Sequence, residues 1–181
     1  MLFDAQKPNN LIAIQSNEVP DYWHVIQPGL KYMVDNNRNP DGWKPAQVFK
    51  LLYEGKASCV FTSIARKPKG NKRKTAEPVL YETREQAILD SCGFGIVQVL
   101  DSPNAKVFHI WIAVSNDTTN KQQAPSILTT FHDEVWELAK GCGCTHISFG
   151  TNQDWWDELA PRFGFSKQET KWITTIPTET K

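Results

Sequence analysis

The sequence predicts a single α+β domain, and three observations support that prediction. The chain has 181 residues, which is enough for one domain with a sizeable core and too few to expect two domains. Segments with the apolar spacing of helices are interspersed with short β-like runs along nearly the whole chain. Neither an internal repeat nor a second apolar core is evident. We therefore expect one domain over residues 1–181.

The composition is that of an ordinary globular protein. Hydrophobic residues make up 40% and charged residues 22% of the chain. Basic and acidic residues number 20 each, so the average charge points to no partner, and any basic surface must be local. No apolar run approaches the roughly 18 residues that cross a bilayer, and the N-terminus lacks a signal-peptide core. We expect no membrane contact and a location in a cytoplasm or in a particle assembled there.

A strand and then a helix are predicted at the N-terminal end. Asn10 to Gln15 reads as a short strand, and Pro20 suits the first turn of a helix. The apolar residues that follow recur at spacings of three and four: Trp23, Ile26, Leu30 and Met33. Pro28 falls inside this stripe and has no N–H to donate, which predicts a kink or a division of the helix.

A second helix and a second strand follow a turn-like segment. Pro45 opens the helix, and Gly55 is placed to end it. Ala57 to Ala65 is β-like. After the basic segment described below, Thr83 to Ser91 predicts a short helix with Thr83 as its N-cap.

The clearest strands are Phe94 to Leu100 and Val107 to Val114, with a turn sequence between them that predicts an antiparallel hairpin. In the second strand, alternation places one apolar set on a common face: Phe108, Ile110, Ile112 and Val114. His109 and Trp111 belong to the set on the other face, which is also largely apolar. The strand is therefore expected to be central and covered on both faces.

The C-terminal third predicts a helix, a strand, a short helix and a last strand. The ranges are Pro125 to Lys140, His146 to Phe149, Asp154 to Arg162 and Lys171 to Ile176. The first helix has an apolar stripe made of Ile127, Leu128, Phe131, Val135, Leu138 and Ala139.

Two neighbouring tryptophans, Trp155 and Trp156, lie in the short helix. Neighbours in a helix are about 100° apart, so the two cannot both face the core. One of them is expected to be exposed, and exposed tryptophans often mark contact surfaces. The alternative is that both lean over the sheet edge.

Cys142 and Cys144, followed by His146, invite a metal interpretation. The spacing is wrong for a zinc knuckle, which needs two residues between the cysteines and a second pair of ligands elsewhere. A helix end with two small buried thiols is the favoured interpretation, and we expect no metal site. The other two cysteines are Cys59 and Cys92.

A basic segment over residues 66–74 holds no acidic residue and six basic ones: Arg66, Lys67, Lys69, Lys72, Arg73 and Lys74. Clustered Lys and Arg can contact nucleic-acid phosphates. The segment lacks interleaved aromatic residues that would stack on bases. An exposed, solvated loop is the favoured interpretation, with nucleic-acid contact as the alternative.

The order of these elements resembles that of GNAT-type N-acyltransferases, over nearly the whole chain. The C-terminal half carries most of the resemblance, through the strand, helix and strand just described and through Trp155-Trp156 ahead of Phe163-Gly164-Phe165. The resemblance implies a mixed central sheet with helices on both faces. It also implies that Val107 to Val114 and His146 to Phe149 lie side by side in parallel.

The N-terminal half resembles a narrower group, the small GNAT-like proteins of tailed bacteriophages, which in some podophages are labelled internal virion proteins. The residues that carry this likeness are Trp23, Ile26, Pro28, Leu30, Pro45, Val48, Leu51 and Leu52. Relative to that group, residues 66–92 look like an insertion. The resemblance implies a phage virion or an infected-host cytoplasm, and contacts with other virion proteins or a host protein.

The resemblance further implies an acetyl-CoA site between the two parallel strands. The pantetheine arm would pair with the strand backbone at Ala113 and Val114, and the pyrophosphate would lie at the start of the following helix. The residues available there are Lys121, Gln122, Gln123, Ser126 and Ile127. The two glycines usual in that loop are missing, and Pro125 offers no N–H, which predicts weak phosphate binding.

His109 is the best candidate for a catalytic base, because an imidazole titrates near neutral pH. Its alternative role is a core histidine beside Trp111. Ala160 occupies the position where the family often has a tyrosine acid, and the helix residues His132, Asp133 and Glu134 look solvated.

Two functions follow from the resemblance. The favoured one is a GNAT-fold phage protein with a degenerate or marginal acyltransferase site, acting as a virion-associated or host-interaction component. The alternative is an active acetyl-CoA-dependent N-acetyltransferase.

Overall fold

The computed structural model describes residues 3–4, 7, 9–64, 81–116, 126–151 and 153–167. Three sequence predictions fall outside these residues. They are the basic segment 66–74, the loop residues Lys121, Gln122 and Gln123, and the last strand at 171–176.

The described strands form one mixed sheet in the order β1-β2-β3-β4-β5. They are β1 (Asn9–Ala13), β2 (Ser58–Ile64), β3 (Gly93–Ser102), β4 (Ala105–Ser115) and β5 (His146–Phe149). The pairs β1–β2, β2–β3 and β3–β4 are antiparallel, and the pair β4–β5 is parallel. The predicted hairpin and the predicted parallel pair are both confirmed.

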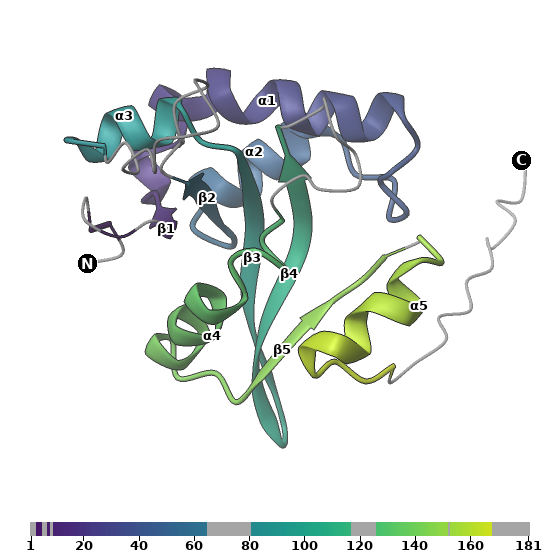
Figure 1. Ribbon diagram of the computed structural model, residues 1–181. Coiled ribbons are helices and arrows are strands. Elements are labelled where there is room, and N and C mark those ends of the chain that lie inside the picture. Colours follow the sequence, from purple (N-terminus) through teal and green to yellow (C-terminus); the bar gives the residue numbers. More distant parts are fainter. Residues whose placement is uncertain are drawn as a thin grey trace, which may run out of the picture.

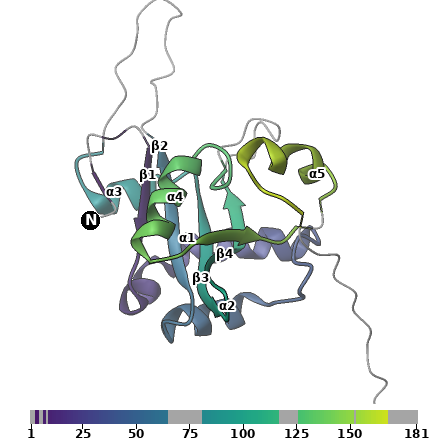
Figure 2. The same cartoon turned by 90° about the horizontal axis from the view of Figure 1, so that it is seen from below.

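Helices cover both faces of this sheet (Figures 1 and 2). One face carries α1 (Val19–Asp35), α2 (Pro45–Tyr53) and α3 (Arg84–Leu89). The other face carries α4 (His132–Gly141) and α5 (Trp156–Leu159), which continues as a 3-10 turn. None of the helices in the described ranges combines the length and the apolar character needed to cross a membrane.

The sheet separates two apolar cores. The α1-side core includes Ile12, Ile26, Leu30, Leu52, Phe61, Ile88, Phe94, Ile96, Ile112 and Val114. The α4-side core includes Leu11, Val60, Val97, Phe108, Ile110, Ile127, Leu128, Phe131, Val135, Ala139 and Trp156. Burial of these side chains is the main favourable contribution to folding.

The helix α1 runs through Pro28 as one element, so of the two predicted effects of the proline the division is wrong. Its packing explains why the helix continues. Gly29, the next residue, lies so close to β3 and β4 that an added Cβ would be 2.8 Å from side-chain atoms of Phe94 and Val114. Apolar contact with the sheet on both sides of the proline offsets the one backbone hydrogen bond that proline removes.

The helix α4 begins later than predicted, at His132 rather than at Pro125. The residues before it form tight turns, in which the amides of Thr129, Thr130 and Phe131 all point to the Ser126 carbonyl, at 3.2, 2.9 and 3.4 Å. Three donors that share one acceptor cannot follow the regular helical pattern. The apolar stripe itself is confirmed, since most of its residues are buried and Leu138 is half-buried.

Other local predictions are confirmed. The Thr83 hydroxyl caps α3 by accepting a hydrogen bond from the Gln86 amide at 3.2 Å. Gly55, just past α2, has a φ of 69°, and Gly164, which ends the last helical turn, has a φ of 79°. Both values lie in the left-handed region that glycine adopts without steric cost.

Candidate functional site

A β-bulge interrupts β4 at Trp111. Ile96 of β3 pairs with Ile112, but the next residue, Val97, pairs with Ile110, so Trp111 has no partner on β3. An extra residue of this kind changes which face the following side chains occupy. The prediction that four alternate apolar residues of β4 share one face is therefore wrong. Two pack in the α4-side core and two in the α1-side core: Phe108 and Ile110, then Ile112 and Val114.

The strands β4 and β5 part beyond the bulge. Their pairing extends only from Val107 opposite His146 to Ile110 opposite Phe149, whereas β4 continues to Ser115. Figure 1 shows the two strands diverging from this point. The β4 edge at Ala113 and Val114 thus has no strand beside it on the β5 side within the described residues. A free strand edge presents backbone N–H and C=O groups to an extended ligand.

His109 lies just before this opening, on the same face as Trp111. Its Nδ1 is 2.9 Å from the Ser148 hydroxyl, and Ser148 is the residue directly opposite on β5. Both side chains are half-buried. The histidine is therefore more than a packed core residue, because it makes a polar contact across the two strands that separate.

The surroundings of this imidazole favour its neutral form. Burial lowers the pKa of His109, and the negative charge of Asp41 opposes this effect only in part. A pKa below the ordinary value near 6.5 leaves a ring nitrogen free to accept a proton at neutral pH. The group thus has the ionisation state that a general base requires.

The segment between α1 and α2 lies next to this face. The Trp43 ring contacts the Trp111 ring edge-on, with centroids 6.3 Å apart. A turn holds Trp43 in place, because the Asn39 side-chain amide donates to the Trp43 carbonyl at 3.0 Å and the Gly42 amide donates to the Asn39 carbonyl at 2.8 Å. This turn also carries Asp41.

Sequence patterns identify His109 but not Ser148, Asp41 or Trp43. Ser148 lies 39 residues from His109 along the chain, and only the strand register brings the two together. Asp41 and Trp43 belong to a turn whose place over the sheet depends on how α1 and α2 pack. No local spacing signal could have identified any of the three.

The described part of the predicted phosphate site fits an anion poorly. The Ser126 amide donates to the Thr130 hydroxyl at 3.4 Å, and the Leu128 amide donates to the Ser126 hydroxyl at 3.2 Å. Ile127 is a buried core residue, whose side chain packs over Gly95. These groups are occupied within their own turn, so the strand edge is the better-formed part of the candidate cofactor site.

His132 differs from its predicted solvated state. It is half-buried, with its ring stacked on Trp136 at 4.7 Å between centroids and near Phe163 at 5.7 Å. Its Nδ1 is 3.1 Å from an Asp133 carboxylate oxygen, and its Nε2 is buried without a partner. Asp133 is exposed as predicted, and Glu134 is half-buried.

The four cysteines are free thiols. Burial raises the pKa of Cys59 and is also the main cause of a raised pKa at Cys144. Cys142 and Cys144 are half-buried, which is less than the prediction of buried thiols. Within the described ranges, no three His, Cys, Asp or Glu side chains cluster closely enough to hold a metal ion.

Only one of the paired tryptophans is buried. Trp156 is 8% exposed and Trp155 is 55% exposed, and their rings stack at 4.6 Å between centroids. Trp156 in turn packs edge-on against Phe149 of β5 at 5.0 Å. Trp155 is thus the outer ring of an ordered aromatic stack.

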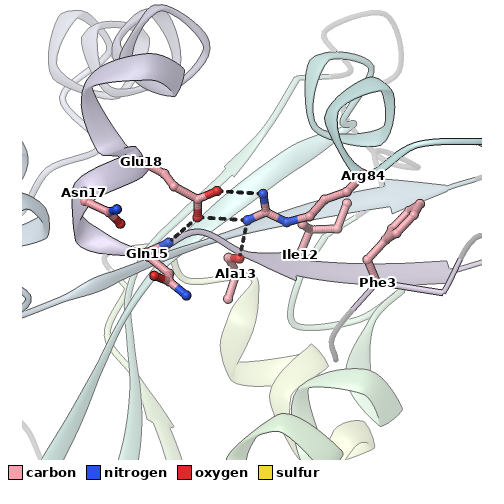
Figure 3. A pocket seen from close by; sticks show the side chains of 7 residues that line it. All are labelled: Phe3, Ile12, Ala13, Gln15, Asn17, Glu18 and Arg84. Carbon is pink, nitrogen blue, oxygen red and sulfur yellow. Dashed lines mark hydrogen bonds and ion pairs between the residues drawn. The ribbon is translucent and has the colours of Figure 1, made fainter.

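A cavity of about 580 Å³ lies at the opposite edge of the sheet, beside β1 (Figure 3). It is lined by Phe3, Ile12, Ala13, Gln15, Asn17, Glu18 and Arg84. Its two charged groups bind each other, at 2.8 and 3.0 Å. A cavity whose charges are paired has less to offer a ligand than the opening at β4 and β5, so we place the candidate site at the opening.

No family model and no curated protein matches the chain. Solved structures do match. The ribosomal-protein-alanine N-acetyltransferase of Brucella melitensis biovar Abortus 2308 has a TM-score of 0.56 at 12% identity, over 93% of this chain and 99% of that chain.

Two further structures extend this comparison. An aminoglycoside acetyltransferase from an uncultured soil metagenomic sample, solved in complex with sisomicin, has a TM-score of 0.56 at 12% identity, over 96% and 100% of the two chains. An acetyltransferase of Trypanosoma brucei has a TM-score of 0.50 at 10% identity, over 93% and 99%. Likeness at these identities concerns the fold, and it shows that the chain has an α+β GNAT-like fold.

Proposed function

We propose that the protein is an acyl-CoA-dependent N-acyltransferase that works at the opening between β4 and β5. The observation that carries the proposal is the half-buried His109, in contact with Ser148 at the point where the two strands part. A fold shared with acetyltransferases raises the expectation of this chemistry but does not establish it.

The residues of the opening suit the parts of such a reaction. The β4 backbone at Ala113 and Val114 would pair with the extended arm of the cofactor, which supplies an activated acyl thioester. His109 would take the proton that the acceptor amine must lose. Trp43 and Trp111 would limit the access of water on the face from which the acceptor approaches.

The test is binding and turnover with one matched control. Calorimetry should detect acetyl-CoA binding, and His109→Ala should lower acetyl transfer to lysine or polyamine acceptors by roughly 100-fold. His146→Ala, an exposed histidine on β5, should leave transfer unchanged. Loss of transfer in both variants, or in neither, would contradict the assignment of His109.

A second candidate is a contact function in a virion or with a host protein. It is supported by the resemblance of the N-terminal half to phage proteins and by the exposed Trp155 ring, which its stacking on Trp156 orders before any partner arrives. Trp155→Ala should then weaken partner binding by roughly 2 kcal/mol with little change in stability. Mass spectrometry of purified phage particles would show directly whether the protein is part of the virion.

A further inference from the structure

The Ser148 hydroxyl and the His109 imidazole contact each other across β4 and β5, as a nucleophile and its base do. The Ser148 oxygen is 2.9 Å from His109 Nδ1, and the parallel register places the two residues directly opposite each other. Both are half-buried and both lie within paired strand backbone. The backbone pairing of β4 and β5 therefore fixes this contact, and no loop has to move to form it.

The rest of the chain offers a useful contrast. His146 Nδ1 is also 2.9 Å from a hydroxyl, that of Thr145, but the two residues are neighbours in sequence and both are exposed. Exposure lets water compete for both groups, whereas partial burial makes the contact between Ser148 and His109 stronger. The exposed pair therefore serves as an internal control for the half-buried pair.

A serine becomes a nucleophile when an adjacent base can take its proton and a third group supports that base. The lowered pKa of His109 favours the neutral imidazole, and its Nδ1 accepts the Ser148 proton in the tautomer that carries its hydrogen on Nε2. The nearby negative charge of Asp41 favours the imidazolium that results. The β4 edge beyond Ile110 has no strand on its β5 side in the described ranges, so its backbone N–H groups can stabilise an oxyanion.

We propose that Ser148 is a nucleophile that carries the acyl group as a serine ester between donor and acceptor. The inference relies on the proposed function for the class of donor, an acyl thioester, and for the amine acceptor.

The chemistry runs in two balanced steps. In the first, the Ser148 oxygen bonds to the acyl carbon, its proton passes to His109, the carbon–sulfur bond breaks, and the departing thiolate takes the proton. In the second, the acceptor amine bonds to the acyl carbon and its proton passes to His109. The ester bond then breaks, and the Ser148 oxygen takes that proton.

One imidazole can serve both steps of the serine route, because it takes a proton as the new bond forms and returns it to the group that leaves. His109 is placed for this role, since the strand register puts it opposite Ser148 and its Nδ1 is 2.9 Å from the Ser148 hydroxyl. The same arrangement also allows water to replace the amine, which would release the free acid.

The test uses acetyl-CoA and, separately, p-nitrophenyl acetate, an activated ester that needs no CoA site. After rapid acid quenching, intact mass spectrometry should show one added acetyl group, and peptide mapping should locate it at Ser148. Ser148→Ala should abolish the label, and His109→Ala should slow its formation by roughly 100-fold. Thr145→Ala and His146→Ala should label like the unchanged protein.

The outcomes separate this inference from the proposed function. Acetyl transfer that survives in Ser148→Ala but is lost in His109→Ala would mean direct transfer, and would overturn the inference alone. Labelling of Ser148 by the ester without acetyl-CoA binding would uphold the nucleophile and contradict the proposed function. Absence of label from both reagents on folded protein would overturn the nucleophile. Should Ser148→Ala fail to fold, Ser148→Cys must still accept the acetyl group.

Discussion

Arg84 joins three parts of the fold through one guanidinium group. Its two terminal nitrogens donate to the Glu18 carboxylate at 2.8 and 3.0 Å, and one of them also donates to the Ala13 carbonyl at 3.0 Å (Figure 3). These bonds connect α3 to the end of β1 and to the turn before α1. The Arg84 hydrogen bond is the main cause of a lowered pKa at Glu18, and Glu18 raises the pKa of Arg84 in return.

Arg84→Ala should lower stability at neutral pH, by about 1 kcal/mol or less because both side chains are partly exposed. The folded pKa of Glu18 is depressed, so its stabilising effect is present above the unfolded value near 4.3 and is lost as the pH falls through the folded value. Thermal melts of the two proteins should therefore converge in acid. A gap that stays constant into acid would assign the effect to the Ala13 contact instead, and Arg84→Lys is the control that keeps the charge.

The candidate site could be predicted from the sequence only where residue type alone is informative. An imidazole inside an apolar strand is unusual enough to single out His109. Serine is common and carries no such signal, so Ser148 becomes a candidate only through the register of β4 and β5. Ser126 and Ile127 show the opposite error, in which the sequence points to residues that are not free to bind. They lie at the expected place for phosphate binding, but Ser126 is hydrogen-bonded within its own turn and Ile127 is buried in the core.

At the scale of elements, apolar spacing predicts most helices because each has one well-buried side, and short apolar runs predict the strands because the sheet is buried on both faces. The spacing misses the bulge in β4 because apolar residues lie on both faces of that strand. A change of face then leaves no trace in the pattern. The late start of α4 is missed for a similar reason, since a tight turn and a helical turn can bury the same apolar residues.

The contact of α1 with the sheet gives a prediction for one glycine. An alanine Cβ at position 29 would be 2.8 Å from side-chain atoms of Phe94 and Val114. Crowding of this kind costs roughly 1 to 3 kcal/mol, against a gain in helix propensity of about 1 kcal/mol. We expect Gly29→Ala to destabilise the protein in urea unfolding, and Gln27→Ala, at an exposed position of α1, to have little effect.

The double variant Gly29→Ala with Val114→Ala provides the check on that explanation. Removal of the Val114 methyl groups relieves one of the two close contacts of the new Cβ and leaves the one with Phe94, so the two changes should cost less together than the sum of their separate costs. Strict additivity would show that the helix and the sheet do not compete for the same space.

At the scale of the whole molecule, one sheet serves two cores, and β4 contributes to both. Before the bulge its buried residues pack under α4, and after it they pack under α1. The bulge lies where β4 parts from β5, so the change of face and the opening occur together. The candidate site therefore depends on a backbone feature that the packing of both cores requires.

Deletion of Trp111 tests this dependence, because it removes the extra residue and restores simple alternation. With a period of two, the residues on one side of the deletion must then turn to the wrong face. Either Ile112 and Val114 leave the α1-side core, or Phe108 and Ile110 leave the α4-side core. We expect loss of near-UV circular dichroism and of cooperative unfolding in guanidinium.

Trp111→Ala is the matched control for the deletion, since it keeps the residue count and hence the bulge. It removes a half-buried ring, which should cost about 1 to 3 kcal/mol while the protein still unfolds in one cooperative transition. The contrast between the two variants separates the side chain from the backbone. If the deletion variant unfolded as cooperatively as Trp111→Ala, the number of residues in β4 would not determine which face of the sheet its side chains occupy. The bulge would then not be the cause of the opening between β4 and β5.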